Sequence, residues 1–361
     1  MEKPKILNDI NSRPVNATCL DLASDMLEEF FYTQHPAKKN SPIGKIEATD
    51  FIKQHIGESI WVYYPWLNTA VHMVSEDMYF ELRTARNREL ISAGDQQKYR
   101  AVKIGIAGLS VGSGILHALV ISGGPQHIRL ADFDVIEVTN LNRIQASLLD
   151  IGATKTDVAA RQVWELDPFA DLRLYPNGVT IENLGEFING LDFFIDEMDS
   201  LDLKLKARLI CKEKKIPVLM CTDNGDTAIL DVERYDLDPD QKPFFGNAGD
   251  LTMADLADRK KWLAYSTQII DPMLMTSELQ ESILKIHAKE LAGIPQLGTT
   301  AGMAGAAISY AIRRITTGHN LQSGRYPISL EAKLIEGYDI SARLQERAKA
   351  SLTFKKKLLG K

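Results

Sequence analysis

The chain has 361 residues, of which 45% are hydrophobic and 25% charged, so it can bury the core of one large domain or of two medium ones. Its formal net charge of −6 opposes binding to nucleic acid or to an anionic membrane surface. Three cysteines, at positions 19, 211 and 221, form no CxxC pair, which argues against a thiolate zinc site and fits a reducing compartment.

The first zone of the sequence, residues 1–80, is expected to be a helical N-terminal extension related to substrate binding. It contains a helical pattern at "LDLASDMLEEFFY" and an aromatic stretch, "SIWVYYPW", which we interpret as core. A further helical pattern, "SEDMYFELRTARNRELI", crosses its end. The N-terminus has no apolar signal segment, and no stretch reaches 18 uncharged apolar residues. We therefore expect a cytoplasmic protein without membrane spans.

Residues 101–235 alternate short apolar runs with helical patterns, from "AVKIGIAG" to "IPVLMCTD". This alternation predicts an α/β fold: a Rossmann-like doubly wound sheet, parallel in its N-terminal half, with helices on both faces. The later segment "GTTAGMAGAAISYAIRRITTG" predicts a helix of small residues that packs closely on a sheet. We expect the nucleotide-binding domain to cover residues 81–330 and a tail to cover 331–361.

The segment "IAGLSVGSG" joins the first strand of this zone to its helix. Gly108, Gly112 and Gly114 make room there, and Ser110 lies between them. Backbone N–H groups and the positive end of a helix dipole at such a turn suit a phosphate. The next strand ends at Asp132, 24 positions after Gly108, where a nucleotide-binding βαβ unit carries its ribose-binding carboxylate. These features leave both NAD and ATP open.

The segments "DFDVIEVTNLNRIQ", "GATKTDVAARQ" and "DEMDS" are more specific. Over roughly residues 80–330 the chain resembles the ThiF-like adenylyltransferase family, which includes sulfur-carrier activating enzymes and the adenylation domains of ubiquitin-activating enzymes. In that family Asp-x-Asp is followed by Asn-Leu-x-Arg-Gln, by a lysine that opens a helix, and by Asp-x-x-Asp-Asn. The matching positions are Asp132, Asn140, Arg143, Lys155 and Asp199.

The resemblance implies ATP and Mg²⁺ as cofactors. Arg143 and Lys155 would offer two cations to a triphosphate, and Asn140 a neutral polar contact. Asp199 would hold the Mg²⁺, because that cation prefers carboxylate and phosphate oxygens. Each residue alone also has a structural interpretation, as part of a capped turn, a solvated lysine or a helix N-cap. Together with the glycine turn they favour ATP over NAD.

Upstream, "RTARNREL" resembles the Asn-Arg pair that members of the family carry before the first strand. There the arginine reaches into the ATP site of the neighbouring subunit. The resemblance therefore implies a homodimer in which Arg88, with Asn87 beside it, completes the partner's site. The alternative is that Arg88 is a surface cation of a helix.

Three departures from the family pattern matter. The glycine loop of the family usually reads Gly-x-Gly-Gly-x-Gly, whereas residues 107–112 read AGLSVG, so a Cβ at 107 or 109 requires a negative φ. The CxxC zinc pairs of several relatives are missing. Many relatives also carry a catalytic cysteine in the crossover loop, but no cysteine follows Cys221 here. We interpret Cys221 as a buried structural thiol and expect no covalent cysteine intermediate.

The sequence thus predicts an ATP-dependent adenylyltransferase. A carboxylate would attack the α-phosphorus of ATP, which forms an acyl-adenylate and pyrophosphate. The acid would be the C-terminus of a small ubiquitin-like carrier protein, a peptide or a small acid, and the adenylate would pass to an amine or a thiol or promote dehydration. Two alternatives stay open: an NAD(P)-dependent oxidoreductase, supported by the glycine turn and Asp132, and a catalytically degenerate nucleotide-binding scaffold, supported by the altered loop and missing cysteine.

Overall fold

The structure is a computed structural model that describes residues 1–7, 9–249, 251–255, 265–266, 268–270, 272–338 and 341–359. It forms two compact units: Met1–Gln97 with Gln162–Ala170, and Lys98–Arg161 with Asp171–Lys361. The predicted domain boundaries at 80/81 and 330/331 remain predictions. Within the described ranges, no helix is both long enough and apolar enough to cross a bilayer.

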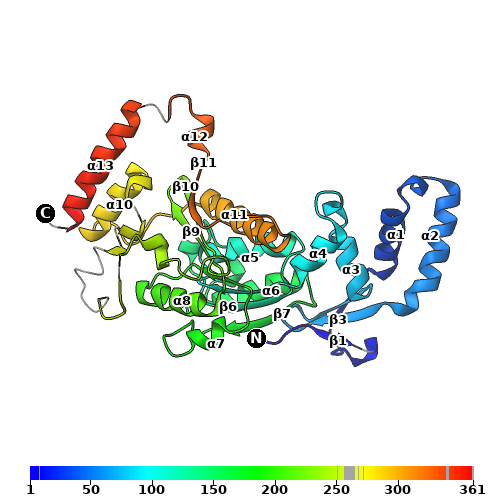
Figure 1. Ribbon diagram of the computed structural model, residues 1–361. Coiled ribbons are helices and arrows are strands. Elements are labelled where there is room, and N and C mark those ends of the chain that lie inside the picture. The colour runs from blue at the N-terminus through cyan, green and yellow to red at the C-terminus, as the bar shows by residue number, and fades with distance from the viewer. Residues whose placement is uncertain are drawn as a thin grey trace. The chain divides into compact units, whose positions relative to one another are not determined.

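The second unit is built on a seven-stranded sheet in the order β11-β10-β9-β8-β5-β6-β7 (Figure 1). Its strands are β5 (Lys103–Ala107), β6 (His127–Ala131), β7 (Asp171–Tyr175), β8 (Phe193–Asp196), β9 (Val218–Asn224), β10 (Thr227–Glu233) and β11 (Gly324–Ser329). The five strands from β5 to β9 pair in parallel, and β10 and β11 add antiparallel pairs at one edge. The predicted α/β sheet, parallel in its N-terminal half, is confirmed.

Helices cover both faces of this sheet, as predicted. They include α5 (Val111–Ile121), α6 (Lys155–Leu166), α7 (Leu184–Ile188), α8 (Leu201–Lys214) and α11 (Gly298–Thr316). Figure 1 shows α11 on one side of the sheet and α7 and α8 on the other. Phe187 of α7 and Cys211 of α8 share one buried cluster with Ala107 and Phe194 of the sheet. Such burial of apolar faces on both sides is what holds a parallel sheet together.

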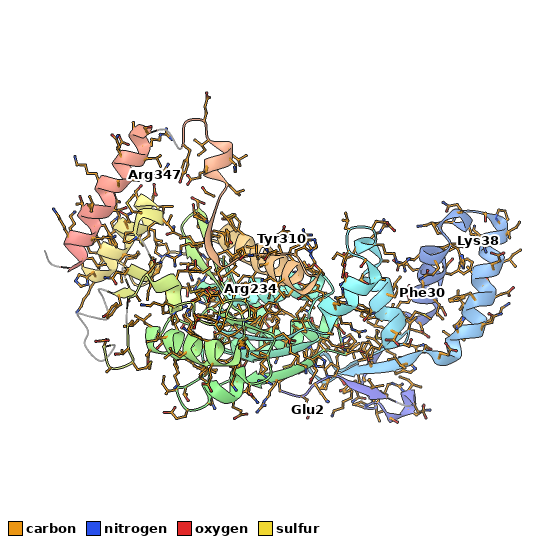
Figure 2. The ribbon with its side chains drawn as sticks, in the orientation of Figure 1. Glu2, Phe30, Lys38, Arg234, Tyr310 and Arg347 are labelled. Carbon is orange, nitrogen blue, oxygen red and sulfur yellow. The ribbon has the colours of Figure 1, made fainter. Side chains whose placement is uncertain are left out.

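The small residues of α11 allow it to approach α5 closely. A Cβ added to Gly305 would lie 2.7 Å from the carbonyl oxygen of Gly114, and one added to Gly114 would lie 3.1 Å from that of Ala301. α11 also contacts β9 and β10. The packing role expected for this helix agrees with these contacts. Tyr310 lies on its exposed side, within 5.7 Å of the guanidinium groups of Arg313 and Arg314 (Figure 2).

The described C-terminal part of this unit also contains α10 (Ser277–His287), α12 (Glu331–Leu334) and α13 (Ser341–Leu359). α10 and α13 pack together through a small core that includes Leu279 and Phe354. In Figure 1 they lie side by side, in yellow and red. Gln280 Nε2 donates to Ser351 Oγ at 3.0 Å, which satisfies two polar groups buried between them.

The first unit contains a sheet as well as helices. Its strands β1 (Lys5–Leu7), β2 (Thr18–Asp21), β3 (Ile60–Tyr64) and β4 (Thr69–Met73) take the order β1-β3-β4-β2. Its helices are α1 (Ala23–Gln34), α2 (Pro42–His55) and α3 (Glu76–Arg83), and α4 (Ala93–Arg100) begins in it. Phe30 of α1 stacks on Phe51 of α2, with ring centroids 6.3 Å apart (Figure 2). The aromatic stretch is core as predicted, because Val62 and Tyr64 of β3 are buried.

Candidate functional site

The order of the strands reverses between β5 and β8. From β5 the chain continues to β6 and β7 on one side, whereas from β8 it continues to β9 on the other. In open parallel sheets, ligands bind outside the carboxyl ends of the strands at such a switch point. The predicted residues Gly108 and Asp199 follow β5 and β8, so both belong to this edge of the sheet.

The glycine turn has the geometry that its sequence requires. Gly108 has φ +96°, and a Cβ there would lie 2.2 Å from the carbonyl oxygen of Glu197, so only glycine fits. Its N–H donates to the carbonyl oxygen of Ala131 at 2.8 Å. Ala107 and Leu109 do not have positive φ, which is the condition for a side chain at each position. The turn leads into α5, whose first N–H groups have no partner within the helix and suit an anion.

The carboxylate of Asp132 stabilises this turn through hydrogen bonds to backbone N–H groups. The residue is 8% exposed, its Oδ2 accepts the N–H of Leu109 at 2.7 Å, and its Oδ1 accepts the N–H of Asp134 at 2.8 Å. The Nζ of Lys155 lies 3.7 Å from Oδ2. Both carboxylate oxygens of Asp132, the residue predicted to bind the ribose, thus already accept hydrogen bonds from backbone N–H groups.

Asp134 is a candidate that the sequence reasoning missed. Its side chain is 51% exposed, and its Oδ2 lies 2.7 Å from Nζ of Lys155, which is itself buried at the start of α6. The backbone N–H of Lys155 also donates to the carbonyl oxygen of Asp134. The second aspartate of the Asp-x-Asp pattern was the available signal. It places a more exposed carboxylate beside the predicted phosphate-binding lysine.

Asn140 takes part in a capping box. Its Oδ1 accepts the N–H of Glu137 at 3.0 Å, and the Glu137 side chain accepts the N–H of Asn140 in return. The residue is 9% exposed. One of its two polar atoms therefore shapes the loop that carries Arg143, as in the capped turn that the sequence left open.

Arg143 and Ser110 are brought together as a pair. Arg143 donates from Nε to Ser110 Oγ at 3.0 Å and from Nη1 to Thr139 O at 3.0 Å and Asn142 Oδ1 at 2.9 Å. Its Nη2 forms no hydrogen bond within the described part of the chain. Burial lowers the pKa of Arg143, and the carboxylates of Asp223 and Asp199 act to raise it. A guanidinium group beside the glycine turn can donate hydrogen bonds to a phosphate.

The two aspartates of the Asp-x-x-Asp pattern differ. Asp196 is fully buried and pairs with Arg208 and with Lys204, whose Nζ lies 3.2 Å from Oδ1. Burial raises its pKa, but the two cations outweigh burial, so the pKa lies below its usual value. Asp199 is exposed, and its carboxylate forms no hydrogen bond to any residue that the structure describes. Only Asp199 is open to a cation.

Side chains alone do not form a metal centre in the described ranges, where no group of three or more His, Cys, Asp or Glu residues converges. Mg²⁺ does not need one, because it binds through one or two carboxylates together with waters and phosphate oxygens. The single exposed carboxylate of Asp199 at the switch point fits that requirement.

Two further acidic residues at this edge carry perturbed pKa values. Burial raises the pKa of Glu197 to about 8, although Lys204 and the N–H of Cys221 act to lower it. Glu197 Oε1 accepts that N–H at 2.8 Å. Burial also raises the pKa of Asp223, near the end of β9, to about 6. An acidic residue at the end of an apolar run was the signal for both.

The cysteines of this unit are buried. Burial raises the pKa of the Cys211 thiol, and it raises that of Cys221 well above its usual value. A reactive cysteine needs exposure and a lowered pKa. The structure therefore agrees with the interpretation of Cys221 as a structural thiol. Cys19 is exposed but belongs to the first unit.

Arg88 lies in the first unit, where its Nη2 donates to Glu81 Oε1 at 2.8 Å. It lines a cavity of about 360 Å³ together with Asn87 and Phe80. The structure does not test its predicted reach into a neighbouring subunit.

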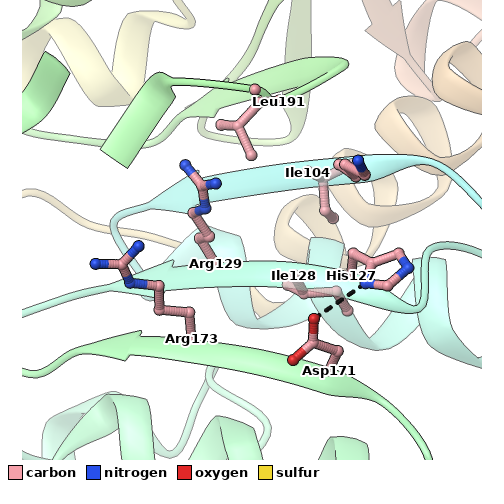
Figure 3. Close-up of a pocket in the computed structure, with 9 residues that line it drawn as sticks. Ile104, His127, Ile128, Arg129, Asp171, Arg173 and Leu191 are labelled. Carbon is pink, nitrogen blue, oxygen red and sulfur yellow. Dashed lines mark hydrogen bonds and ion pairs between the residues drawn. The ribbon is translucent and has the colours of Figure 1, made fainter. Parts of the chain in front are cut away.

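A larger cavity, of about 500 Å³, lies at the opposite edge of the large sheet, where β5, β6 and β7 begin (Figure 3). Three of its charged or titratable side chains, His127, Arg129 and Arg173, have partners close to the cavity. His127 Nδ1 lies 3.1 Å from Asp171 Oδ2, and Arg129 Nη1 donates to backbone carbonyl oxygens at the end of α7. Arg173 pairs with Glu186. Because it lies at the opposite edge of the sheet, the cavity is separate from the predicted nucleotide site.

The sequence is similar to that of several known proteins. Residues 84–327 match the ThiF family. The uncharacterized protein MT1398 of Mycobacterium tuberculosis (strain CDC 1551 / Oshkosh) is 37% identical over 276 residues, 76% of this chain and 38% of that protein. A tRNA threonylcarbamoyladenosine dehydratase of Haemophilus influenzae is 33% identical over 144 residues, 38% of this chain and 54% of that protein. The chain thus spans about two fifths to one half of these relatives.

Among solved structures, Escherichia coli MccB with MccA-N7isoASN has a TM-score of 0.52 at 17% identity and covers 85% of this chain and 84% of its own. MccB is also solved with ATP, at a TM-score of 0.50. This likeness shows a common fold.

Proposed function

Because the chain belongs to the ThiF family, we propose that it is an ATP-dependent adenylyltransferase, which activates a carboxylate as an acyl-adenylate and releases pyrophosphate. The observation that carries the proposal is the meeting of the glycine turn, Arg143 and Lys155 at the switch point of the sheet. The solved complex of MccB with ATP supports an ATP site on this fold. The family match favours this activity over the oxidoreductase alternative.

In the proposed complex, the N-terminal turn of α5 and Arg143 bind the phosphates, and Ser110 holds Arg143 against the turn. Lys155 adds a buried positive charge. The half-exposed Asp134 binds the ribose hydroxyls, while Asp132 keeps the turn in place. Catalysis comes from orientation of the triphosphate and from stabilisation of the charge that develops as the substrate carboxylate attacks the α-phosphorus.

Mg²⁺ fits the edge of the site at Asp199, whose exposed carboxylate is the hard oxygen donor that this cation prefers. When bound, the ion would neutralise charge on the phosphate oxygens of ATP. We expect Asp199→Asn to raise the Mg²⁺ concentration needed for half-maximal activity more than it weakens binding of metal-free ATP.

The acid is a C-terminal carboxylate of a small ubiquitin-like carrier protein, a peptide or a small acid. MccB, solved with MccA-N7isoASN, supports a peptide or peptide-like acid. The buried Cys211 and Cys221 support transfer of the adenylate to an acceptor from outside this unit rather than to one of its own thiols. We further propose a cytoplasmic homodimer.

The experiment is a pyrophosphate-exchange screen of the full chain with ATP and Mg²⁺ across carrier proteins, peptides and small acids. Arg143→Ala and Lys155→Ala should each weaken ATP binding by about 1.5–3 kcal/mol, the range for hydrogen bonds to charged groups. Lys103→Ala, which removes an exposed cation from the opposite edge, is the matched control. If none of the acids supports pyrophosphate exchange, the proposed activity is contradicted. Unchanged ATP affinity in both variants would contradict the assignment of Arg143 and Lys155 to the phosphates.

A further inference from the structure

Asp223 lies beside the predicted nucleotide site without a role in it. It is the sixth residue of β9, which runs parallel to β8, so it is near the same carboxyl edge as Asp199. Its Oδ2 accepts the N–H of Leu297, the residue that precedes α11, at 3.3 Å. The adjacent Gln296 accepts a hydrogen bond from Ser110 at 3.4 Å, which ties this corner to the glycine turn.

The other carboxylate oxygen of Asp223 lacks a partner. Oδ1 is buried, and no residue that the structure describes meets it with hydrogen-bond geometry, although the N–H of Gly225 acts on this carboxylate in addition to that of Leu297. Nearly all buried polar atoms in folded proteins are satisfied, so an orphaned carboxylate oxygen at the edge of a site needs an explanation. A ligand that carries a hydrogen-bond donor would supply one.

The charges around Asp223 show which kind of ligand fits. The charged groups that act on it are Arg143, from the loop after β6, and Asp226, from the turn that follows β9. Cys221, two positions earlier on the strand, is buried, and Leu297 contributes only a backbone group. A second anion close to Asp223 would be repelled, whereas an amino group would satisfy Oδ1.

Resting on the proposed adenylation, we propose that Asp223 receives an amine as the acyl acceptor: its carboxylate binds the amino group and takes a proton from the nitrogen as that nitrogen attacks the acyl-adenylate. A thiol acceptor would react as a thiolate, and the carboxylate would repel it. Burial raises the pKa of Asp223 to about 6, which keeps it mostly ionised at neutral pH and suits a general base there.

The step balances as an amide formation. A C–N bond forms between the amine and the acyl carbon, and the bond from that carbon to the phosphate oxygen breaks. AMP leaves with the electron pair of the broken bond. One proton passes from nitrogen to Oδ1 of Asp223 and then to solvent, so the products are an amide, AMP and a proton.

The first test needs no knowledge of the acid. The full chain is treated at pH 6 with a water-soluble carbodiimide and methylamine, and the modified sites are quantified by peptide mass spectrometry. Asp226, exposed on the next turn, is the internal reference. We expect Asp223 to form its methylamide at least as fast as Asp226. A labelled Asp226 with an unlabelled Asp223 would show that the carboxylate of Asp223 is closed to the carbodiimide or to the amine, and would overturn the proposal.

The second test uses an acid that supports pyrophosphate exchange. Asp223→Asn should leave the exchange rate within about 2-fold, while amine-dependent AMP release at pH 7.5 falls about 100-fold, the lower range for loss of a general base. In the unmodified chain this release should rise with pH through about 6 and then level off; the variant should lose that rise, and Asp223→Glu should restore part of the rate. Asp226→Asn is the control.

The outcomes separate the two proposals. Equal losses of exchange and of AMP release in Asp223→Asn would make Asp223 a residue that positions ATP and overturn its role as base. If no acid supports pyrophosphate exchange in the unmodified chain, adenylation itself is contradicted. The carbodiimide experiment would still decide whether Asp223 is accessible.

Discussion

Asp132 and Asp134 are two positions apart but have different surroundings. Asp132 is buried and accepts two backbone N–H groups, whereas Asp134 is half exposed and accepts from Lys155. A buried carboxylate with both oxygens occupied acts on the conformation of its loop. A half-exposed one keeps lone pairs for a ligand.

We expect Asp132→Asn to lower the free energy of unfolding by about 1–3 kcal/mol, because the amide NH₂ would face a backbone donor that the carboxylate now satisfies. Asp134→Asn should change stability by at most about 1 kcal/mol, since it removes only a partly exposed ion pair. It should instead weaken ATP binding. Urea unfolding and calorimetric titration with ATP measure the two effects; unchanged ATP affinity in Asp134→Asn would return the ribose role to Asp132.

Gly108 is the residue of the turn that tolerates no side chain. Gly108→Ala should cost about 1–3 kcal/mol for the positive φ alone, and the contact with Glu197 adds to that cost. Gly185→Ala in α7 is the matched control, because its Cβ would meet open space and alanine favours a helix. Urea unfolding that shows equal stability for the two variants would contradict the close approach between the ends of β5 and β8.

Three elements of the second unit are joined by a buried ionic network. Arg208 of α8 pairs with Asp196 of β8 and, at 2.6 Å, with Glu233 of β10, and its guanidinium lies 4.0 Å from the Phe244 ring centroid. Tyr235 also donates to Glu233. Every charge in the network has a partner of opposite sign, so loss of one member leaves another uncompensated.

This network makes stability depend on pH in the acid range. The pKa of Asp196 in the folded protein is lowered by Lys204 and Arg208 against the effect of burial. Its ionised form therefore contributes stability that is present above the ordinary aspartate pKa, near 4, and is lost as pH falls through the lower folded value.

Asp196→Asn should cost about 3–5 kcal/mol at pH 7, because it breaks a buried pair, and it should flatten the loss of stability below pH 4. Urea unfolding at pH 7, 4.5 and 3 measures both effects, with the exposed Asp240→Asn as control. Parallel pH profiles for the variant and the unmodified chain would show that Asp196 does not carry this dependence.

At the scale of the whole molecule, the proposed homodimer can be tested through Arg88. If two copies form shared sites, each combines the glycine turn, Arg143 and Lys155 of one chain with Arg88 of the other. A two-fold axis makes both sites equivalent. The pairing of Arg88 with the partly exposed Glu81 is weak enough to be replaced by contact with a triphosphate.

We expect Arg88→Ala and Lys155→Ala each to be poorly active alone. Their mixture should recover activity after subunit exchange, because one site of each mixed dimer combines an intact Arg88 with an intact Lys155. The measurements are the mass in solution and the exchange activity of the mixture. A monomer at assay concentration, or proven subunit exchange without recovery, would contradict the shared site.

Local patterns in the sequence were enough for the sheet and for the turn that opens the site. Apolar runs separated by helical segments predict parallel strands. A glycine between a strand and a helix predicts a tight turn, and this prediction does not depend on the position of the next strand. Arg143 and Lys155 were assigned from the resemblance to the ThiF-like family, whose motif order places an arginine and a lysine after the glycine turn. In the first unit the same patterns located helices but left "IWVYY" as core rather than as a strand, although one of its two partners, β4, follows it directly in a hairpin and only β1 is distant in sequence.

The allocation of polar groups depended on contacts between different elements of the fold. Asp132 is occupied because Leu109 from the preceding turn donates to it, and Asp196 is neutralised because Arg208 and Lys204 come from the next helix. Asp223 keeps an oxygen without a well-formed hydrogen bond, because Leu297, 74 positions later, donates to Oδ2 and not to Oδ1. Hydrogen bonds and burial are properties of neighbours in space, so which aspartate is structural and which is free to act emerges only when the chain is folded.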